Sequence, residues 1–157
     1  MKISNLIGIL VVALVLIAGA ADRSSAQTVS GSIGNGTVSR GSAAKGKIVL
    51  SIPGGLHVNS NRPNSQYAIP TTARITGAGL RIGGVSFPRG KNRKFQFSES
   101  TINVYEGLVT FPFTVTVPAN FKGNVVRLRV VVRYQACTEE VCYPPKTKEV
   151  TLIARVR

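Results

Sequence analysis

The chain has 157 residues, a length typical of one domain, and its 20 lysine and arginine residues outnumber six acidic ones to give a net charge of +14. This charge indicates either a well-solvated surface or attraction to something acidic, such as an anionic surface of the cell envelope. Nucleic acid is excluded as a partner, because there is no tryptophan and no aromatic residue alternates with the basic cluster 89–94 to stack on bases.

Residues 1–26 have the layout of a secretory signal peptide. Lys2 gives a positive start, residues 6–21 are almost wholly apolar, and small residues follow at candidate cleavage sites. The apolar part is short for a membrane-spanning helix, which needs ~20 residues. We therefore expect an exported protein, with an uncleaved N-terminal membrane anchor as the alternative.

The rest of the chain has the pattern of an all-β domain. Residues 27–44 are rich in Ser, Gly and Thr, and we expect a flexible lead there. Over residues 45–157, apolar and polar residues alternate with a period of two, and turn residues separate the runs. In the longest run, 125–134, apolar side chains fill one face and three arginines the other. About seven or eight such strands in roughly 110 residues predict an immunoglobulin-like β-sandwich.

The only two cysteines, Cys137 and Cys142, lie in the stretch YQACTEEVCYPP. The strands expected before and after it place them on either side of a hairpin tip, residues 138–141. Cross-strand pairs bring Cα atoms to about 4.5–5.5 Å, within the range that disulfides need. Two cysteines in an exported chain most often form one disulfide. A metal site would lack ligands, since His57 is the only histidine and acidic residues are few.

This disulfide would be a modest staple. It closes a ring of about six residues, for which the chain-entropy estimate is roughly 2 kcal/mol, about half the value for a bond between distant strands. A disulfide at an exposed tip is also open to attack by a thiolate. The spacing therefore leaves two interpretations open, a redox pair and an inert structural disulfide. No phosphate-cradling or dinucleotide-binding pattern is present, and we expect no cofactor.

The YQAC–CYPP motif, followed by KTKEVTL, resembles the N-terminal periplasmic domain of the bacterial thiol:disulfide interchange protein DsbD family. Shorter segments are also similar to that family, namely GLHVN at 55–59, IPTT at 69–72, VSFP at 85–88 and VYEG at 104–107. The resemblance covers about residues 45–155. It implies an immunoglobulin-like sandwich in the bacterial periplasm or cell envelope.

The resemblance also implies a function. The domain would receive electrons from a membrane-embedded partner by way of a thioredoxin-like domain and pass them to oxidised envelope proteins by thiol–disulfide exchange. By position, Cys142 would form the intermolecular disulfide and Cys137 would resolve it. The family covers its pair with an aromatic side chain on a cap loop; Phe97 is the best match and Phe95 the alternative, although core packing accounts for either residue equally well.

His57 and Tyr143 complete the expected site. The position of His57 suggests closeness to the pair, where a charged imidazole would lower a thiol pKa, but a solvated histidine after the Pro-Gly-Gly turn is the simpler interpretation. Tyr143 precedes two prolines that restrict the backbone just after Cys142.

The chain departs from the family's reductase, because it has neither a series of membrane spans nor a Cys-x-x-Cys domain. A protein-disulfide reductase activity would therefore need a separate electron donor. The alternative function is a non-enzymatic immunoglobulin-like binding or structural module with an inert hairpin disulfide.

Overall fold

The computed structural model describes residues 26–157, which form an all-β domain. The expected signal peptide, apart from its last residue, lies outside the described residues. Within residues 26–157 there is no helix that is long and apolar enough to cross a membrane. The predicted all-β class is confirmed.

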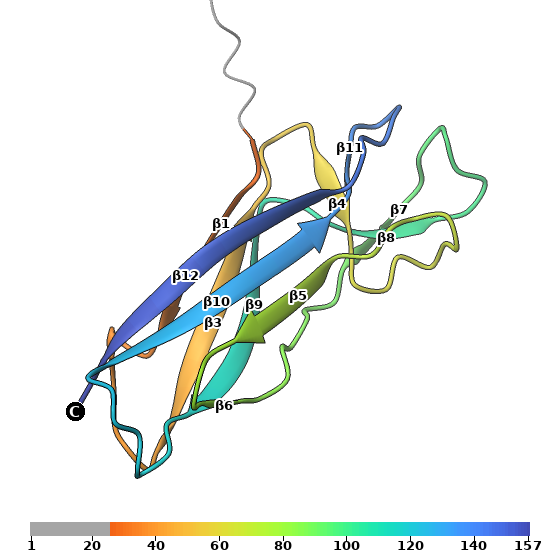
Figure 1. Ribbon diagram of the computed structural model, residues 1–157. Coiled ribbons are helices and arrows are strands. Elements are labelled where there is room, and N and C mark those ends of the chain that lie inside the picture. Colours follow the sequence, from red (N-terminus) through yellow and green to blue (C-terminus); the bar gives the residue numbers. More distant parts are fainter. Residues whose placement is uncertain (1–25) are drawn as a thin grey trace, which may run out of the picture.

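Within residues 26–157, twelve strands form three four-stranded sheets (Figure 1). The first sheet contains, in spatial order, β1 (Thr28–Ile33), β3 (Ala43–Ser51), β9 (Leu108–Thr116) and β6 (Arg81–Ile82). The second contains β2 (Thr37–Val38), β12 (Lys146–Val156), β10 (Val125–Tyr134) and β5 (Thr72–Thr76). The third contains β11 (Ala136–Cys137), β4 (His57–Asn59), β8 (Ile102–Tyr105) and β7 (Lys91–Arg93).

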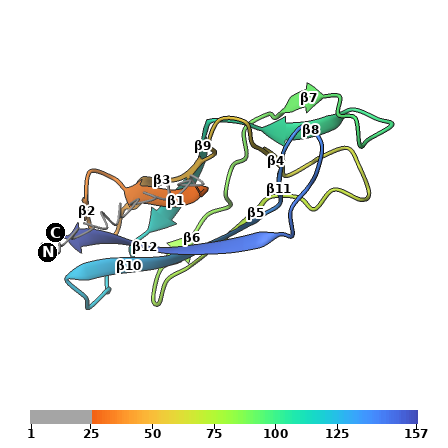
Figure 2. The same cartoon turned by 90° about the horizontal axis from the view of Figure 1, so that it is seen from above.

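The first two sheets pack face to face as the predicted immunoglobulin-like sandwich, and Figure 2 shows them as two layers. The alternation along β10 decides which side chains lie between them. Val126, Leu128, Val130, Val132 and Tyr134 are fully buried, while the arginines between them are exposed. Each large apolar side chain buried in this way contributes roughly 1.5–3 kcal/mol.

The number of strands exceeds the predicted seven or eight. Six of the twelve have only two to four residues. Segments this short contain too little alternation to be recognised in a sequence. They are defined by their pairing with longer or neighbouring strands.

The prediction of a flexible lead at 27–44 is wrong for most of that segment. Residues 28–33 form β1, which pairs along its length with β3, and Ile33 is fully buried. Gly31 shows why the segment is rich in small residues: a Cβ there would lie 2.4 Å from the Lys47 carbonyl oxygen and 3.1 Å from the Leu152 side chain. The composition that suggested flexibility permits close packing of β1 between β3 and β12.

The third sheet extends beyond one end of the sandwich (Figure 2). One of its two central strands, β4, is buried at all three residues. Phe95, Ile102 and Val104 form a small core of their own there, against which Ala68 packs. The cysteine pair belongs to this sheet, because β11 pairs with β4.

Candidate functional site

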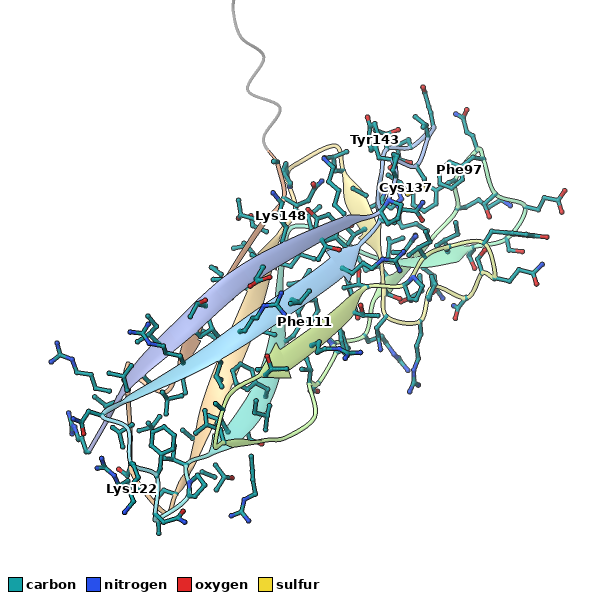
Figure 3. The ribbon with its side chains drawn as sticks, in the orientation of Figure 1. Phe97, Phe111, Lys122, Cys137, Tyr143 and Lys148 are labelled. Carbon is teal, nitrogen blue, oxygen red and sulfur yellow. A yellow bond between two sulfur atoms is a disulfide. The ribbon has the colours of Figure 1, made fainter. Side chains whose placement is uncertain are left out.

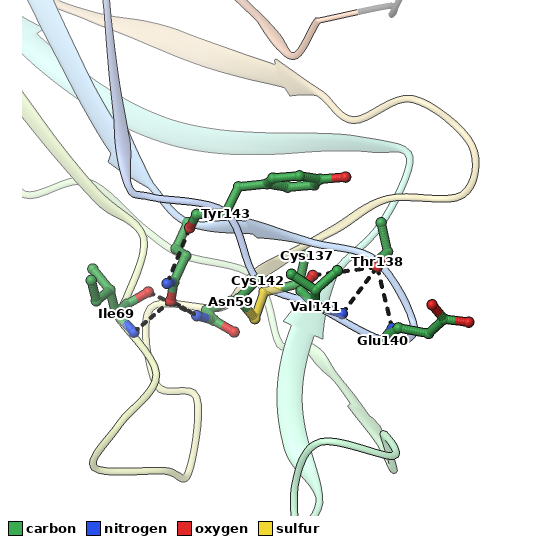
Figure 4. The surroundings of a disulfide bond; sticks show 9 residues. Asn59, Ile69, Cys137, Thr138, Glu140, Val141, Cys142 and Tyr143 are labelled. Atoms are coloured by element: carbon green, nitrogen blue, oxygen red, sulfur yellow. Dashed lines mark hydrogen bonds between the residues drawn. A yellow bond between two sulfur atoms is a disulfide. The ribbon is translucent and has the colours of Figure 1, made fainter.

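Cys137 and Cys142 form a disulfide at a hairpin tip that turns from the second sheet onto the third (Figure 4). The ladder between β10 and β12 ends at the pair Tyr134 and Lys146, and Cys137 then pairs with His57 of β4. The S–S bond is 2.03 Å long and the Cα atoms are 4.0 Å apart. The predicted hairpin disulfide is confirmed.

Thr138 shapes the turn between the cysteines. Its N–H donates to the Val141 carbonyl oxygen at 2.8 Å, and its hydroxyl accepts bonds from the N–H groups of Glu140 and Val141 at 3.2 and 3.1 Å. Such a side-chain turn fixes a short loop without glycine. Beyond Cys142, the Tyr143 N–H donates to the Ala136 carbonyl oxygen at 2.9 Å, while its ring stays exposed.

The two cysteines differ in burial. Cys137 is completely buried, so the disulfide is less exposed than the sequence indicated. Cys142 is half-buried and lines a cavity of 610 Å³. An incoming thiolate therefore reaches the sulfur of Cys142 more easily than that of Cys137.

The cavity beside Cys142 has aromatic walls. Phe97 and Tyr67 line it, and both are exposed. Phe97 lies in the loop between β7 and β8, close to the cysteine hairpin (Figure 3). The structure thus brings Phe97 and Cys142 to one cavity.

Three rings connect this cavity to the buried cysteine. The rings of Phe97 and Phe95 stack with centroids 5.2 Å apart, and Phe95 stacks on His57 at 4.1 Å. Phe95 is 2% exposed and belongs to the small core of the third sheet, whereas Phe97 is 40% exposed. Phe95 is therefore a packing residue that supports Phe97 at the cavity.

His57 is buried, so the expectation of a solvated histidine is wrong. It is 2% exposed, and its Nε2 atom is buried without a hydrogen-bond partner in the described part of the chain. Burial lowers its pKa below 6.5, because the charged imidazole loses hydration; Glu139 and Glu106 oppose this effect and Arg93 adds to it. The imidazole beside the cysteine pair is therefore neutral near pH 7. A charged imidazole that lowers the pKa of a cysteine thiol, one of the two sequence-based interpretations, does not fit this burial.

Arg93, at the end of β7, links β7 and β8 to the cysteine hairpin, and the sequence did not single it out as a site residue. Its guanidinium pairs with Glu139 in the turn between the cysteines at 3.1 Å and with Glu106 after β8. It also lies 5.8 Å from the centroid of the Phe95 ring. The basic cluster in which it stands was the available signal, but nothing in the sequence indicated its partners.

Gln135 is a second residue that the sequence did not single out, although it belongs to the YQAC motif. Its Oε1 atom accepts from Asn59 Nδ2 at 2.9 Å and from the Ile69 N–H at 3.2 Å, and its Nε2 donates to the Tyr143 carbonyl oxygen at 3.2 Å. These bonds join the 55–59 and 69–72 segments to the cysteine hairpin (Figure 4). Within residues 26–157, no three His, Cys, Asp or Glu side chains gather to hold a metal ion.

The described residues thus combine an immunoglobulin-like sandwich with a hairpin disulfide at one end. Residues 35–154 match the family described as "Thiol:disulfide interchange protein DsbD, N-terminal", and the chain belongs to this family. Family membership and the bonded cysteine pair together support a general role in thiol–disulfide exchange.

Individual relatives cover only parts of the chain. It is 32% identical over 80 residues to the thiol:disulfide interchange protein DsbD of Tatumella citrea, and the matched stretch covers 50% of this chain and 12% of that protein. It is 25% identical over 97 residues to the thiol:disulfide interchange protein DsbD of Actinobacillus pleuropneumoniae, and this match covers 62% of the present chain and 15% of that protein. The chain thus spans less than a sixth of the length of either relative.

Two solved structures are also similar. The reduced N-terminal domain of DsbD from Neisseria meningitidis is 22% identical with a TM-score of 0.47, covering 70% of this chain and 77% of that one. The N-terminal periplasmic domain of ScsB from Proteus mirabilis is 12% identical with a TM-score of 0.48, covering 82% and 46%.

Proposed function

We propose that the domain relays electrons in the bacterial periplasm or cell envelope by thiol–disulfide exchange, from a thioredoxin-like donor to oxidised exported proteins. The unequal burial of the two cysteines supports this relay most directly. A half-buried Cys142 beside a cavity suits attack by a partner, and a fully buried Cys137 suits a resolving role. The excess of positive charge would also draw the domain toward anionic envelope surfaces.

The exchange balances in two stages. A donor thiolate attacks Sγ of Cys142, the disulfide breaks, and Cys137 leaves as a thiolate that takes up a proton. The second donor thiolate then attacks the donor sulfur of the mixed disulfide and releases Cys142, so that two electrons have passed to the domain and the donor is oxidised. In the onward stage Cys142 attacks the acceptor disulfide, and Cys137 attacks Sγ of Cys142 to release the acceptor as a dithiol.

Four side chains around the pair have accessory roles in this relay. Phe97 covers the cavity side of Cys142, and Phe95 holds the Phe97 ring by stacking. His57, buried and directly opposite Cys137, keeps an uncharged ring beside that sulfur, since burial lowers the pKa of the imidazole. Tyr143 lies exposed after Cys142, where a partner would meet it.

The second candidate is a binding or structural module with an inert disulfide. Complete burial of Cys137 and the hydrogen-bonded turn at Thr138 favour it, because both protect the bond from exchange.

The reduction potential of the pair decides between the two functions. It is measured by equilibrating residues 26–157 in glutathione buffers and trapping the free thiols. A value above about −300 mV, with rapid reduction by a thioredoxin-like protein, supports the relay. A value below that limit without exchange assigns the hairpin to the structural module. In the Cys137→Ser variant, the Cys142 thiolate should attack the disulfide of an oxidised partner and form a mixed disulfide that persists, because no Cys137 thiol is left to resolve it.

A further inference from the structure

A second cavity, of 490 Å³, adjoins the cavity of Cys142. The two share Asn64 in their walls, and the second is also lined by Arg62, Arg89, Asn61 and Asn103. Asn64 has a φ of 62°, the one positive φ at a non-glycine residue within 26–157. Asparagine adopts this left-handed conformation more readily than most residues, and strained positions of this kind cluster at functional sites.

The segments that carry the two arginines are anchored to the same strand residue, Asn103 of β8. The Ser60 N–H donates to the Asn103 carbonyl oxygen, and the Asn103 N–H donates to the Pro63 carbonyl oxygen, both at 2.9 Å. These bonds hold the loop that contains Arg62. On the other side, Gly90 packs so tightly that a Cβ there would lie 2.1 Å from Oδ1 of Asn103. The arginines therefore reach one cavity from two fixed pieces of backbone.

The cavity is electropositive. No acidic residue lines it, and among the ion pairs of residues 26–157 none involves Arg62 or Arg89. A guanidinium presents its N–H groups as a planar fork that matches a carboxylate, and asparagine amides supply further donors. Charge-assisted bonds of this type are roughly twice as strong as neutral ones.

We propose that this cavity is a carboxylate-binding subsite that recognises an acidic side chain of the redox partner. The identity of the occupant rests on the proposed function, because the subsite adjoins the cavity of the reactive cysteine. A partner seated over Cys142 with an ordinary interface of about 800 Å² per side would extend past Asn64 and cover the subsite. Partners with Asp or Glu beside their reactive disulfide are selected in this way.

The test compares two disulfide-bonded peptides that differ only in charge. One carries Asp and Glu near its cystine, and the other carries Asn and Gln at the same positions. The reduced domain is mixed with each peptide over a range of concentrations, and the rate of exchange is followed. We expect the acidic peptide to react at least about tenfold more efficiently, the factor that hydrogen bonds to a charged group supply.

Matched variants locate the preference. Arg62→Gln/Arg89→Gln should abolish it while changing the rate with the neutral peptide by no more than about twofold, as is usual for surface substitutions. Arg74→Gln/Arg127→Gln removes the same charge from exposed residues of β5 and β10, outside both cavities, and should retain the preference. The subsite is overturned if both double variants lose the preference for the acidic peptide equally, or if Arg62→Gln/Arg89→Gln retains it.

Binding is measured apart from exchange, so that the subsite and the relay can fail separately. Peptides in which serine replaces both cysteines are titrated into the oxidised domain by calorimetry. If the acidic peptide binds no more tightly than the neutral peptide, the subsite is overturned, even if the domain exchanges disulfides with the cystine peptides. The same holds if acetate binds but the domain does not distinguish the two peptides. If the acidic peptide binds better but no peptide exchanges, the subsite stands and the relay is overturned.

Discussion

His57 lies directly opposite Cys137 in the antiparallel pair of β4 and β11, and its ring stacks on Phe95. Side chains of directly opposed strand residues lie on the same face of a sheet. The only histidine of the chain is therefore next to the buried member of the cysteine pair. Its protonation affects both the stability of the third sheet and the surroundings of the cysteines.

The domain should lose stability in mild acid because of His57. Burial holds the pKa of the folded imidazole below 6.5, while that of the unfolded chain is near 6.5. As pH falls through about 6.5, the unfolded chain therefore takes up a proton that the folded domain does not, and the free energy of unfolding decreases until the folded pKa is reached. Urea denaturation at about pH 7.5 and about pH 5.5 measures this change.

His57→Phe is the matched variant for this prediction. It can retain stacking on Phe95 and removes the unpartnered Nε2 atom, so the variant should be at least as stable as the original at neutral pH. Between the same two pH values its urea midpoint should change less than that of the original chain. An equal change in both proteins would mean that another group causes the acid sensitivity.

Phe97→Ala should speed reduction of the disulfide by dithiothreitol at little cost in stability. Phe97 is 40% exposed and shares the cavity of Cys142, so its removal opens that sulfur without emptying a core. Phe95→Leu, in contrast, should raise the rate less, because Phe97 stays beside the sulfur and loses only the ring on which it stacks. The opposite order of rates would assign the cover to Phe95. Phe95→Ala is less informative, since it should cost about 3–5 kcal/mol and disturb the third sheet.

Arg93→Gln should also speed reduction, by loosening the hairpin. The variant loses the ion pair with Glu139, which lies between the two cysteines. An exposed pair contributes about 0.2–1 kcal/mol, so the increase should not exceed about fivefold and should shrink in high salt. Arg129→Gln is the control, because it breaks the exposed pair with Glu149 on the second sheet, away from the cysteines. A similar increase in the control would exclude a local effect of Arg93.

Alternation along the chain was enough to predict the all-β class, and the short spacing of the cysteines was enough to predict a hairpin disulfide, because each signal lies within a short stretch of sequence. Along β10, the side chains that alternate with its arginines are those that are buried. The YQAC–CYPP motif likewise contains both cysteines and the turn between them.

Features that depend on distant residues were missed. Whether β1 is ordered is decided by β3 and Leu152, and a Ser/Gly-rich segment carries no trace of that pairing. The burial of His57 requires Phe95 stacked on its ring and Cys137 opposite it in the sheet. These three residues come from three separate segments of the chain. Arg93 and Gln135 act through partners far along the chain for the same reason.

Gln135→Ala should destabilise the domain and loosen the hairpin together. The variant leaves the Asn59 amide, the Ile69 N–H and the Tyr143 carbonyl oxygen without their partner. Because unsatisfied, partly buried polar groups cost about 1–3 kcal/mol, we expect a loss in that range by urea denaturation of the oxidised protein.

A double-mutant cycle with Asn59→Ala separates this network from a general loss of packing. If the two side chains act through their 2.9 Å hydrogen bond, the loss in the double variant should be smaller than the sum of the two single losses by about 0.5 kcal/mol or more. Gln135→Glu keeps the acceptor for Asn59 and Ile69 but cannot donate to the Tyr143 carbonyl oxygen at neutral pH. The hairpin after Cys142 should therefore loosen, and hydrogen exchange of the Tyr143 N–H, which bonds to Ala136, should increase more than that of the Ile69 N–H. Strict additivity in the cycle, with unchanged exchange at 143, would show that Gln135 does not couple the loops to the cysteine hairpin.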